Sequence, residues 1–282
     1  MKILLFGSTG QVGSTFLEKA EIETVNRSEA NLENPVSCFE KILESQPDLV
    51  INAAAFTSVD AAEEQKELVT LVNGVAPVEM SKAAANLNIP FIHLSSEYVF
   101  SGEGQAPWCP TDIMAPLNTY GRSKQMAEHG IKLVGGVHVI LRTSWVFSDQ
   151  NDNFVKKILK LAKSNNNLSV VSDQIGGPTA ADDVSEAILK IGKMIIENKA
   201  LSGTYHYSGR EDINRANFAR EILSQAGEET IVTDVLSSTF QPNADRPLNS
   251  RLDCSKTFDT FGIERPDWKH GLHNVLCRLG VI

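Results

Sequence analysis

The sequence predicts an α/β fold in which a doubly wound parallel sheet carries a smaller C-terminal α/β lobe. Two observations lead to this prediction. Short apolar runs alternate with segments of helical periodicity over the first half of the chain, and the first apolar run leads directly into a glycine-rich turn. The chain has 282 residues, which is enough for a substantial core and for one large domain with a lobe or two domains.

The first strand is expected at residues 2–6, an apolar run too short for a buried helix. It continues into Gly7-Ser-Thr-Gly10-Gln11-Val12-Gly13, and residues 14–20 are expected to form a helix. In a Rossmann-type domain this order places backbone N–H groups and a helix N-terminus against a pyrophosphate. The G-x-x-G-x-x-G spacing is looser than G-x-G-x-x-G, and alone it also fits an ordinary strand–helix turn.

Further strands and helices then follow in alternation, which predicts right-handed βαβ units and helices on both faces of the sheet. The expected strands are residues 22–26, 48–52, 90–95 and 137–141, and the expected helices are residues 35–45, 66–87 and 117–134.

After Arg142 the alternation loosens. We assign residues 1–147, with about 168–197 returning to the sheet, to an NAD(P)-binding domain. Residues from about 148 to 167 and from 198 to 282 are assigned to a substrate-binding lobe. The elements expected in this part are helices at 153–163 and 180–196 and strands at 168–172 and 203–207.

Composition narrows the class of protein. The net charge of −9 and the lack of a basic run argue against nucleic acid or an anionic membrane surface as a partner. We expect no transmembrane segment and no signal peptide. The four cysteines lack C-x-x-C spacing, so neither a zinc site nor a disulfide framework is indicated, and a cytoplasmic location is expected.

Parallel sheets bind ligands at the carboxyl ends of their strands, so the residues that follow each strand are informative. Arg27 follows the second strand, where an acid for a ribose 2′-hydroxyl would otherwise stand. A guanidinium there favours a 2′-phosphate, which predicts that NADPH is used at least as well as NADH. The alternative is a solvated Arg27 whose charge is balanced by Glu29.

Small and hydroxylated residues follow the next two strands. Ala53-Ala54-Ala55-Phe-Thr57 would let a flat ligand approach the backbone, although tight sheet packing explains the same pattern. Ser96 ends the following strand and could hydrogen-bond a substrate carbonyl, although such serines are also common caps and turn formers.

Tyr120 and Lys124 stand four residues apart on an expected helix, so their side chains share one face. An ammonium beside a phenol favours the phenolate, which would let Tyr120 exchange a proton near neutral pH. The same spacing occurs on many solvated helices, so the pair gains meaning from the glycine turn and Ser96.

Together the glycine turn, Ser96 and the Tyr120–Lys124 pair resemble the extended short-chain dehydrogenase/reductase family. More narrowly, the chain is similar to the dTDP-4-dehydrorhamnose reductases of dTDP-L-rhamnose synthesis. That similarity rests on an ordered set of segments along nearly the whole chain: residues 52–60, 96–100, 142–147, 173–179, 203–206 and 246–253.

The resemblance implies an NAD(P)H-dependent reductase for the C4 keto group of the nucleotide sugar dTDP-4-dehydro-6-deoxy-L-mannose. Tyr120 would be the general acid, Lys124 would hold the nicotinamide ribose and keep the Tyr120 pKa low, and Ser96 would donate to the carbonyl oxygen. The implied cofactor contacts are Gly7, Gly10, Gln11, Val12, Gly13, Arg27, Ala53, Ala54, Ala55, Thr57, Tyr120 and Lys124. The implied substrate contacts are Val59, Glu97, Tyr98, Trp145 and Arg246.

Several points stay open at this stage. The family usually has Ser-Thr-Asp-Tyr where this chain has Ser95-Ser96-Glu97-Tyr98, which bears on the choice of sugar more than on the reaction. Trp145 is alternatively a core aromatic, and Arg246 alternatively pairs with Asp245 or Asp253. Some relatives are metal-assisted dimers, but no Glu cluster maps to such a site, so a Mg²⁺ requirement and the choice between monomer and homodimer are open.

Two rival classes remain. Nucleotide-sugar epimerases and 4,6-dehydratases share the glycine turn and the Tyr/Lys pair, but dehydratases need a second carboxylate where Tyr98 stands. A non-catalytic regulatory subunit of methionine adenosyltransferase has a similar fold. The retained trio of Ser96, Tyr120 and Lys124 favours an enzyme, because a binding role does not require it.

Overall fold

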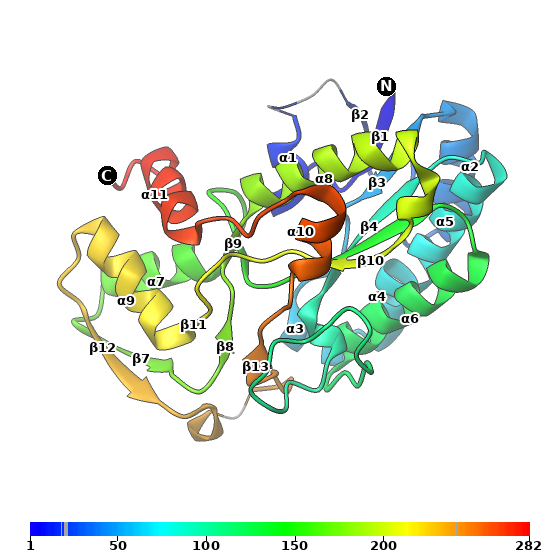
Figure 1. Cartoon of the computed structure of the whole chain (residues 1–282). Coiled ribbons are helices and arrows are strands. Elements are labelled where there is room, and N and C mark those ends of the chain that lie inside the picture. The colour runs from blue at the N-terminus through cyan, green and yellow to red at the C-terminus, as the bar shows by residue number, and fades with distance from the viewer. Residues whose placement is uncertain (18, 20–21, 241) are drawn as a thin grey trace.

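A six-stranded parallel sheet forms the centre of the larger lobe (Figure 1). The computed structural model describes residues 1–17, 19, 22–240 and 242–282. The strand order is β10-β5-β4-β3-β1-β2, and every neighbouring pair is parallel. This topology confirms the predicted doubly wound α/β fold. The strands are β1 (Ile3–Phe6), β2 (Glu23–Val25), β3 (Leu49–Asn52), β4 (Phe91–Ser96), β5 (His138–Thr143) and β10 (Gly203–His206).

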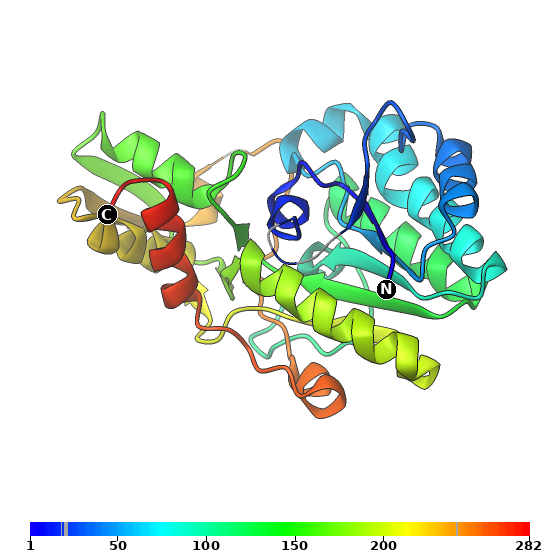
Figure 2. The same ribbon diagram turned by 90° about the horizontal axis from the view of Figure 1, so that it is seen from above.

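Helices cover both faces of this sheet, as Figure 2 shows from above. Alternate side chains of one strand therefore enter different cores: Leu5 packs with the helices on one face, and Leu4 packs with those on the other. The first face carries α1 (Gln11–Thr15) and α8 (Ala181–Glu197), and the second carries α2 (Pro35–Ser45), α5 (Ala76–Asn86) and α6 (Thr119–Val134).

Two expected helices differ in detail. The single helix expected at 66–87 is divided into α4 (Lys66–Val69), a π-helical turn η1 (Thr70–Val75) and α5. Pro77 has no N–H to donate to the Asn73 carbonyl, which interrupts the regular α-helical hydrogen bonding there. The buried Asn73 side chain accepts the Phe56 N–H at 2.7 Å and donates to the Phe56 oxygen at 2.9 Å. The helix expected at 14–20 begins at Gln11 and ends at Thr15, and its positions 18 and 20 lie outside the described residues.

The smaller lobe has its own apolar core, built around Phe147, Phe218 and Trp268. Its parallel pair β7–β12 lies beside helices α7 and α9, and α11 packs on α9 (Figure 1). The elements of this lobe and of the segments joining it to the sheet are β6 (Val146–Phe147), α7 (Phe154–Ala162), β7 (Asn167–Val171), β8 (Ile175–Gly176), β9 (Thr179–Ala180), β11 (Ile213–Asn214), α9 (Arg215–Ala226), β12 (Ile231–Val235), β13 (Asn249–Ser250) and α11 (Trp268–Arg278).

The lobe boundary differs from the predicted one in two segments. The strand at 168–172 was expected to return to the sheet, but β7 pairs with β12 in the smaller lobe. The strand at 203–207 was assigned to the smaller lobe, but β10 pairs with β5 at the edge of the large sheet. The positions of both strands were predicted correctly, but the sheet that each one joins was predicted wrongly. A strand's own residues do not specify which sheet it joins. Helix α8 does cover the large sheet, as expected.

The remaining short elements lie near the strand ends or at the surface. They are α3 (Val59–Glu64), η2 (Glu97–Val99), η3 (Lys199–Leu201), η4 (Ser237–Thr239) and α10 (Ser255–Phe261). Among the described helices, none has the length and apolar character needed to span a membrane.

Candidate active site

A cavity of about 620 Å³ lies where the carboxyl ends of the strands face the smaller lobe. Its wall brings together nearly all residues that the sequence singled out; Gly13 and Arg246 are not in the wall. The predicted residues that line it are Gly7, Gly10, Gln11, Val12, Arg27, Ala53, Ala54, Ala55, Thr57, Val59, Ser96, Glu97, Tyr98, Tyr120, Lys124 and Trp145.

The glycine turn at one end of the cavity fits a dinucleotide pyrophosphate. Gly7 has φ +91°, and a Cβ there would lie 2.5 Å from the Ala54 nitrogen. A Cβ on Gly13 would lie 1.8 Å from the Gly7 oxygen, so α1 packs directly on the turn. The turn therefore requires glycine at position 7, and the packing of α1 requires glycine at position 13. The backbone at Gly10 stays open to a ligand.

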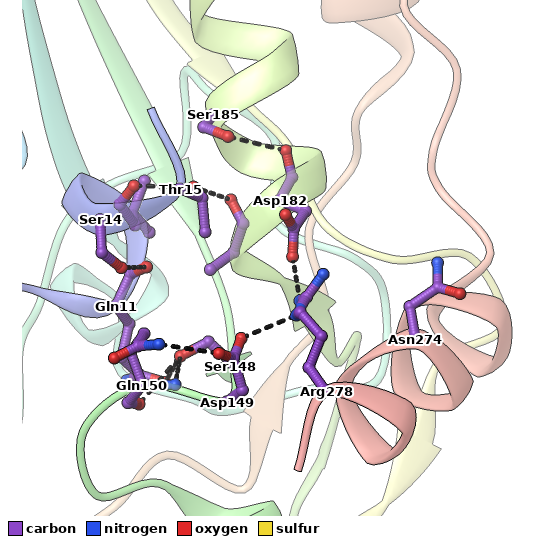
Figure 3. A network of polar contacts seen from close by, with 12 residues as sticks. Gln11, Ser14, Thr15, Ser148, Asp149, Gln150, Asp182, Ser185, Asn274 and Arg278 are labelled. Atoms are coloured by element: carbon purple, nitrogen blue, oxygen red, sulfur yellow. Dashed lines mark hydrogen bonds and ion pairs between the residues drawn. The ribbon is translucent and has the colours of Figure 1, made fainter. Parts of the chain in front are cut away.

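A loop of the smaller lobe, residues 148–153, contacts this turn, and we call it the clasp loop. Ser148 Oγ donates to Gln11 Oε1 at 3.1 Å, and Asn151 Nδ2 donates to the Thr9 oxygen at 2.8 Å. Arg278 of α11 holds the loop through Asp149 at 2.9 Å (Figure 3). The same guanidinium bonds Asp182 of α8 at 2.5 Å, so one side chain ties both lobes together beside the turn.

Arg27 lines the cavity beyond β2 and is exposed. Glu29 does not pair with it: its carboxylate accepts from the Asn26 N–H at 3.0 Å and approaches Lys41 at 3.9 Å. In the part of the chain that the structure describes, no ion pair engages Arg27. Its guanidinium is thus available to an anionic ligand.

Tyr120 and Lys124 occupy one face of α6, whose first turn is capped by Asn118. A Cβ on Gly121 would lie 2.2 Å from the Tyr98 oxygen, so α6 packs closely on η2. The Tyr98 and Tyr120 rings consequently meet edge to face, with centroids 5.5 Å apart. This packing turns Tyr120 toward the end of β4, where Ser96 lies.

The pKa of Tyr120 differs from the expectation. Burial and the Glu97 carboxylate raise the pKa of the phenol above its ordinary value, and the neighbouring Ser96 lowers it only in part. Lys124 is 2% exposed, and its Nζ donates to the Leu94 oxygen at 3.0 Å. Burial lowers the pKa of Lys124 to about 8. The predicted lowering of the Tyr120 pKa by Lys124 is therefore wrong for this arrangement.

Ser96 and Glu97 form a close pair beside Tyr120. Ser96 Oγ lies 2.6 Å from Glu97 Oε2 and also accepts the Tyr98 N–H at 3.2 Å. Glu97 is only 2% exposed, and burial raises its pKa to about 7. The reaction end of the cavity thus contains two hydroxyl groups and a carboxyl group that titrates near neutrality.

Arg215 is a cavity residue that the sequence did not reveal. Its guanidinium carbon lies 3.6 Å from the Trp145 ring centroid and 4.9 Å from that of Phe154. Trp145 has a φ of +47°, an uncommon conformation for a bulky residue. Nothing in the local sequence distinguishes Arg215 from a solvated arginine, because its stacking partners come from distant segments.

Arg246 pairs with neither Asp245 nor Asp253. Its Nη2 lies 2.5 Å from Asp60 Oδ2, which joins the C-terminal segment to α3, and the Arg246 guanidinium lowers the Asp60 pKa. The described residues contain no group of three or more His, Cys, Asp or Glu side chains placed to hold a metal ion.

The glycine turn and the Ser/Tyr/Lys trio at the strand ends define an extended short-chain dehydrogenase/reductase. The family model "RmlD substrate binding domain" matches residues 1–281, and the chain belongs to that family.

Curated and solved relatives agree with this assignment. The chain is 36% identical to dTDP-4-dehydrorhamnose reductase of Sinorhizobium fredii (strain NBRC 101917 / NGR234), over 99% of this chain and 98% of that protein. A crystal structure of a dTDP-4-dehydrorhamnose reductase from Clostridium acetobutylicum superposes with a TM-score of 0.91 at 31% identity, covering 99% and 100% of the two chains. The enzyme from Bacillus anthracis, solved in complex with NADP, has a TM-score of 0.91 at 29% identity, with 98% and 99% covered.

Proposed function

We propose that this chain reduces the C4 keto group of dTDP-4-dehydro-6-deoxy-L-mannose to give dTDP-L-rhamnose, with NADPH or NADH as reductant. The observation that carries the proposal is that Tyr120, Ser96 and Lys124 line the same cavity as the glycine turn. The names of the full-length relatives support the identity of the substrate.

The chain's own residues supply the proton and the electrostatic stabilisation. The bound reduced nicotinamide provides the hydride for the sugar C4. Tyr120 donates its proton to the C4 oxygen, where negative charge develops, because its phenol lies beside Ser96 in the cavity wall. Ser96 donates a hydrogen bond to the same oxygen, and the Lys124 ammonium adds positive charge nearby.

The substrate side of the cavity contains Trp145 and Arg215. Arg215 is better placed than Arg246 to bind the sugar diphosphate, since it lines the cavity while Arg246 is paired with Asp60. Trp145 would pack against the sugar ring, with Val59, Glu97 and Tyr98 around it.

We propose that Arg27 binds the 2′-phosphate of NADPH, because it lines the cavity beyond β2 and is not neutralised by Glu29. Arg27→Ala should raise the KM for NADPH about tenfold and leave the KM for NADH within about twofold, as expected when one charge-assisted hydrogen bond is lost. An unchanged ratio of the two KM values would refute this role.

The proposed reaction is tested with purified protein, NADPH and enzymatically generated dTDP-4-dehydro-6-deoxy-L-mannose. Loss of reduced-nicotinamide absorbance in step with formation of dTDP-L-rhamnose is expected. Sugar product without net NADPH oxidation would indicate an epimerase. No conversion of this or other nucleotide sugars, combined with retained NADPH binding, would indicate a binding role.

A further inference from the structure

Glu97 is a buried carboxyl group that the proposed steps leave unused. It follows Ser96 directly, lines the cavity and is only 2% exposed. Its Oε2 lies 2.6 Å from Ser96 Oγ, whereas its Oε1 has no hydrogen-bond partner among the described residues. A buried oxygen without a partner is more costly in a carboxylate than in a neutral carboxylic acid.

The hydrogen bonds of Ser96 depend on the protonation of Glu97. A serine hydroxyl has one proton to donate and two lone pairs to accept with. One lone pair accepts the Tyr98 N–H. If Glu97 is ionised, its carboxylate takes the Ser96 proton, which is then not available to a substrate oxygen. If Glu97 is protonated, its O–H donates to the second lone pair, and the Ser96 proton is free.

The groups around Glu97 allow both states. The Arg215 guanidinium of α9 and the phenols of Tyr98 and Tyr120 are near enough to Glu97 to interact with its charge. Burial raises the pKa of Glu97 to about 7, while the hydrogen bonds from Ser96 and from the Glu97 backbone N–H, and then the Arg215 charge, oppose this rise. The Lys124 ammonium donates to the Leu94 oxygen at 3.0 Å.

We propose that Glu97, in its protonated form, is a second proton donor of the reduction, acting through Ser96 on Tyr120. This inference rests on the proposed function. When the C4 oxygen has taken the Tyr120 proton, the Ser96 proton passes to the phenolate and the Glu97 proton passes to Ser96. The net result of these three proton transfers is one alcohol on the sugar and one carboxylate at Glu97. Arg215 stabilises that carboxylate, and solvent reprotonates it after the product leaves.

The variant Glu97→Gln tests whether Glu97 supplies a proton or only a hydrogen bond to Ser96. The side-chain amide of this variant can still donate to Ser96 Oγ, but it has no acidic proton. We expect kcat to fall about 10- to 100-fold, at or below the lower end of general acid–base effects, with NADPH affinity within about twofold. The wild-type kcat should decrease as the pH rises through about 7, and this decrease should be absent from Glu97→Gln.

Two further variants and a spectroscopic readout sharpen the test. Glu97→Asp keeps an acid and should keep the pH dependence, and Glu103→Gln, at an exposed glutamate, should match wild type in both kcat and pH profile. Infrared difference spectra of the protein without substrate should show a buried carboxylic-acid band below neutral pH that Glu97→Gln lacks.

Wild-type kcat and pH profile in Glu97→Gln would overturn the inference, and so would a missing carboxylic-acid band in the wild type. Absence of any wild-type reduction would instead refute the proposed function. In that case the infrared titration would still support or overturn the protonated state of Glu97.

Discussion

The two ends of the cavity hold their residues by different forces. At the reaction end, Ser96, Glu97 and Lys124 are 6%, 2% and 2% exposed, and burial shifts the pKa values of Glu97 and Lys124 toward neutrality. At the cofactor end, the clasp loop is held by Arg278, whose side chain is 35% exposed. Charges act strongly in a dry site and are screened at a wet one. Substitutions at the reaction end should therefore lower kcat. Substitutions at the clasp loop should weaken NADPH binding, and their effects should be smaller.

Tyr120→Phe should give the largest effect. Phenylalanine preserves the edge-to-face contact with Tyr98 but removes the proton donor, so kcat should fall by about 10²- to 10⁴-fold. Stopped-flow kinetics measures kcat, and a fluorescence titration measures the affinity for NADPH, which should stay close to that of the wild type. A kcat within a few fold of wild type would remove Tyr120 from the reaction.

Gly13→Ala tests whether the close packing of the glycine turn is needed for NADPH binding. The added Cβ would stand 1.8 Å from the Gly7 oxygen, so the turn must shift. Overpacking of this kind costs about 1–3 kcal/mol, and we expect NADPH affinity to fall about 10- to 100-fold. Gly74→Ala is the control, because Gly74 is not in the cavity wall and its Cβ would meet only the flexible Met126 side chain, 2.8 Å from Sδ, so NADPH affinity should stay near that of the wild type. Equal affinities in both variants would contradict this account of the turn.

Arg215→Lys should affect the nucleotide sugar and not the cofactor. Lysine keeps the charge but loses the planar group that stacks on Trp145 at 3.6 Å. The KM for the sugar substrate should rise about tenfold, as for the loss of one charge-assisted hydrogen bond, at unchanged NADPH affinity. Initial-rate kinetics with each substrate varied in turn measures both. Arg246→Lys serves as the comparison, and a larger effect there would reverse the assignment of the diphosphate contact.

Arg278→Gln should give the smallest effect. It removes the pairs to Asp149 and Asp182 that hold the clasp loop, but the guanidinium is partly exposed and screened. Loss of about 0.5–1 kcal/mol predicts a two- to fivefold weaker binding of NADPH, at unchanged kcat. Calorimetric titrations at low and high salt should show that the difference between variant and wild type shrinks as salt rises. A kcat defect would indicate that the two ends of the cavity are coupled.

Local features of the sequence were sufficient for much of this structure. Short apolar runs located the strands of the large sheet, and the residues after those strands meet in one cavity, because parallel strands all end at the same edge. The Tyr120–Lys124 spacing placed both side chains on one helix face. The pKa of Tyr120 did not follow from that spacing, since Lys124 donates to Leu94 and burial dominates.

The sequence by itself determined the elements, the glycine turn and the side chains that we propose react, because periodicity and turn chemistry act over a few neighbouring residues. The tertiary structure alone decided that β10 joins the large sheet and β7 the smaller one. It also decided that Arg215 stacks on Trp145, that Arg246 pairs with Asp60 and that Arg278 holds the clasp loop. Each of these contacts joins residues far apart in the chain, and which of them form depends on how the two lobes pack together.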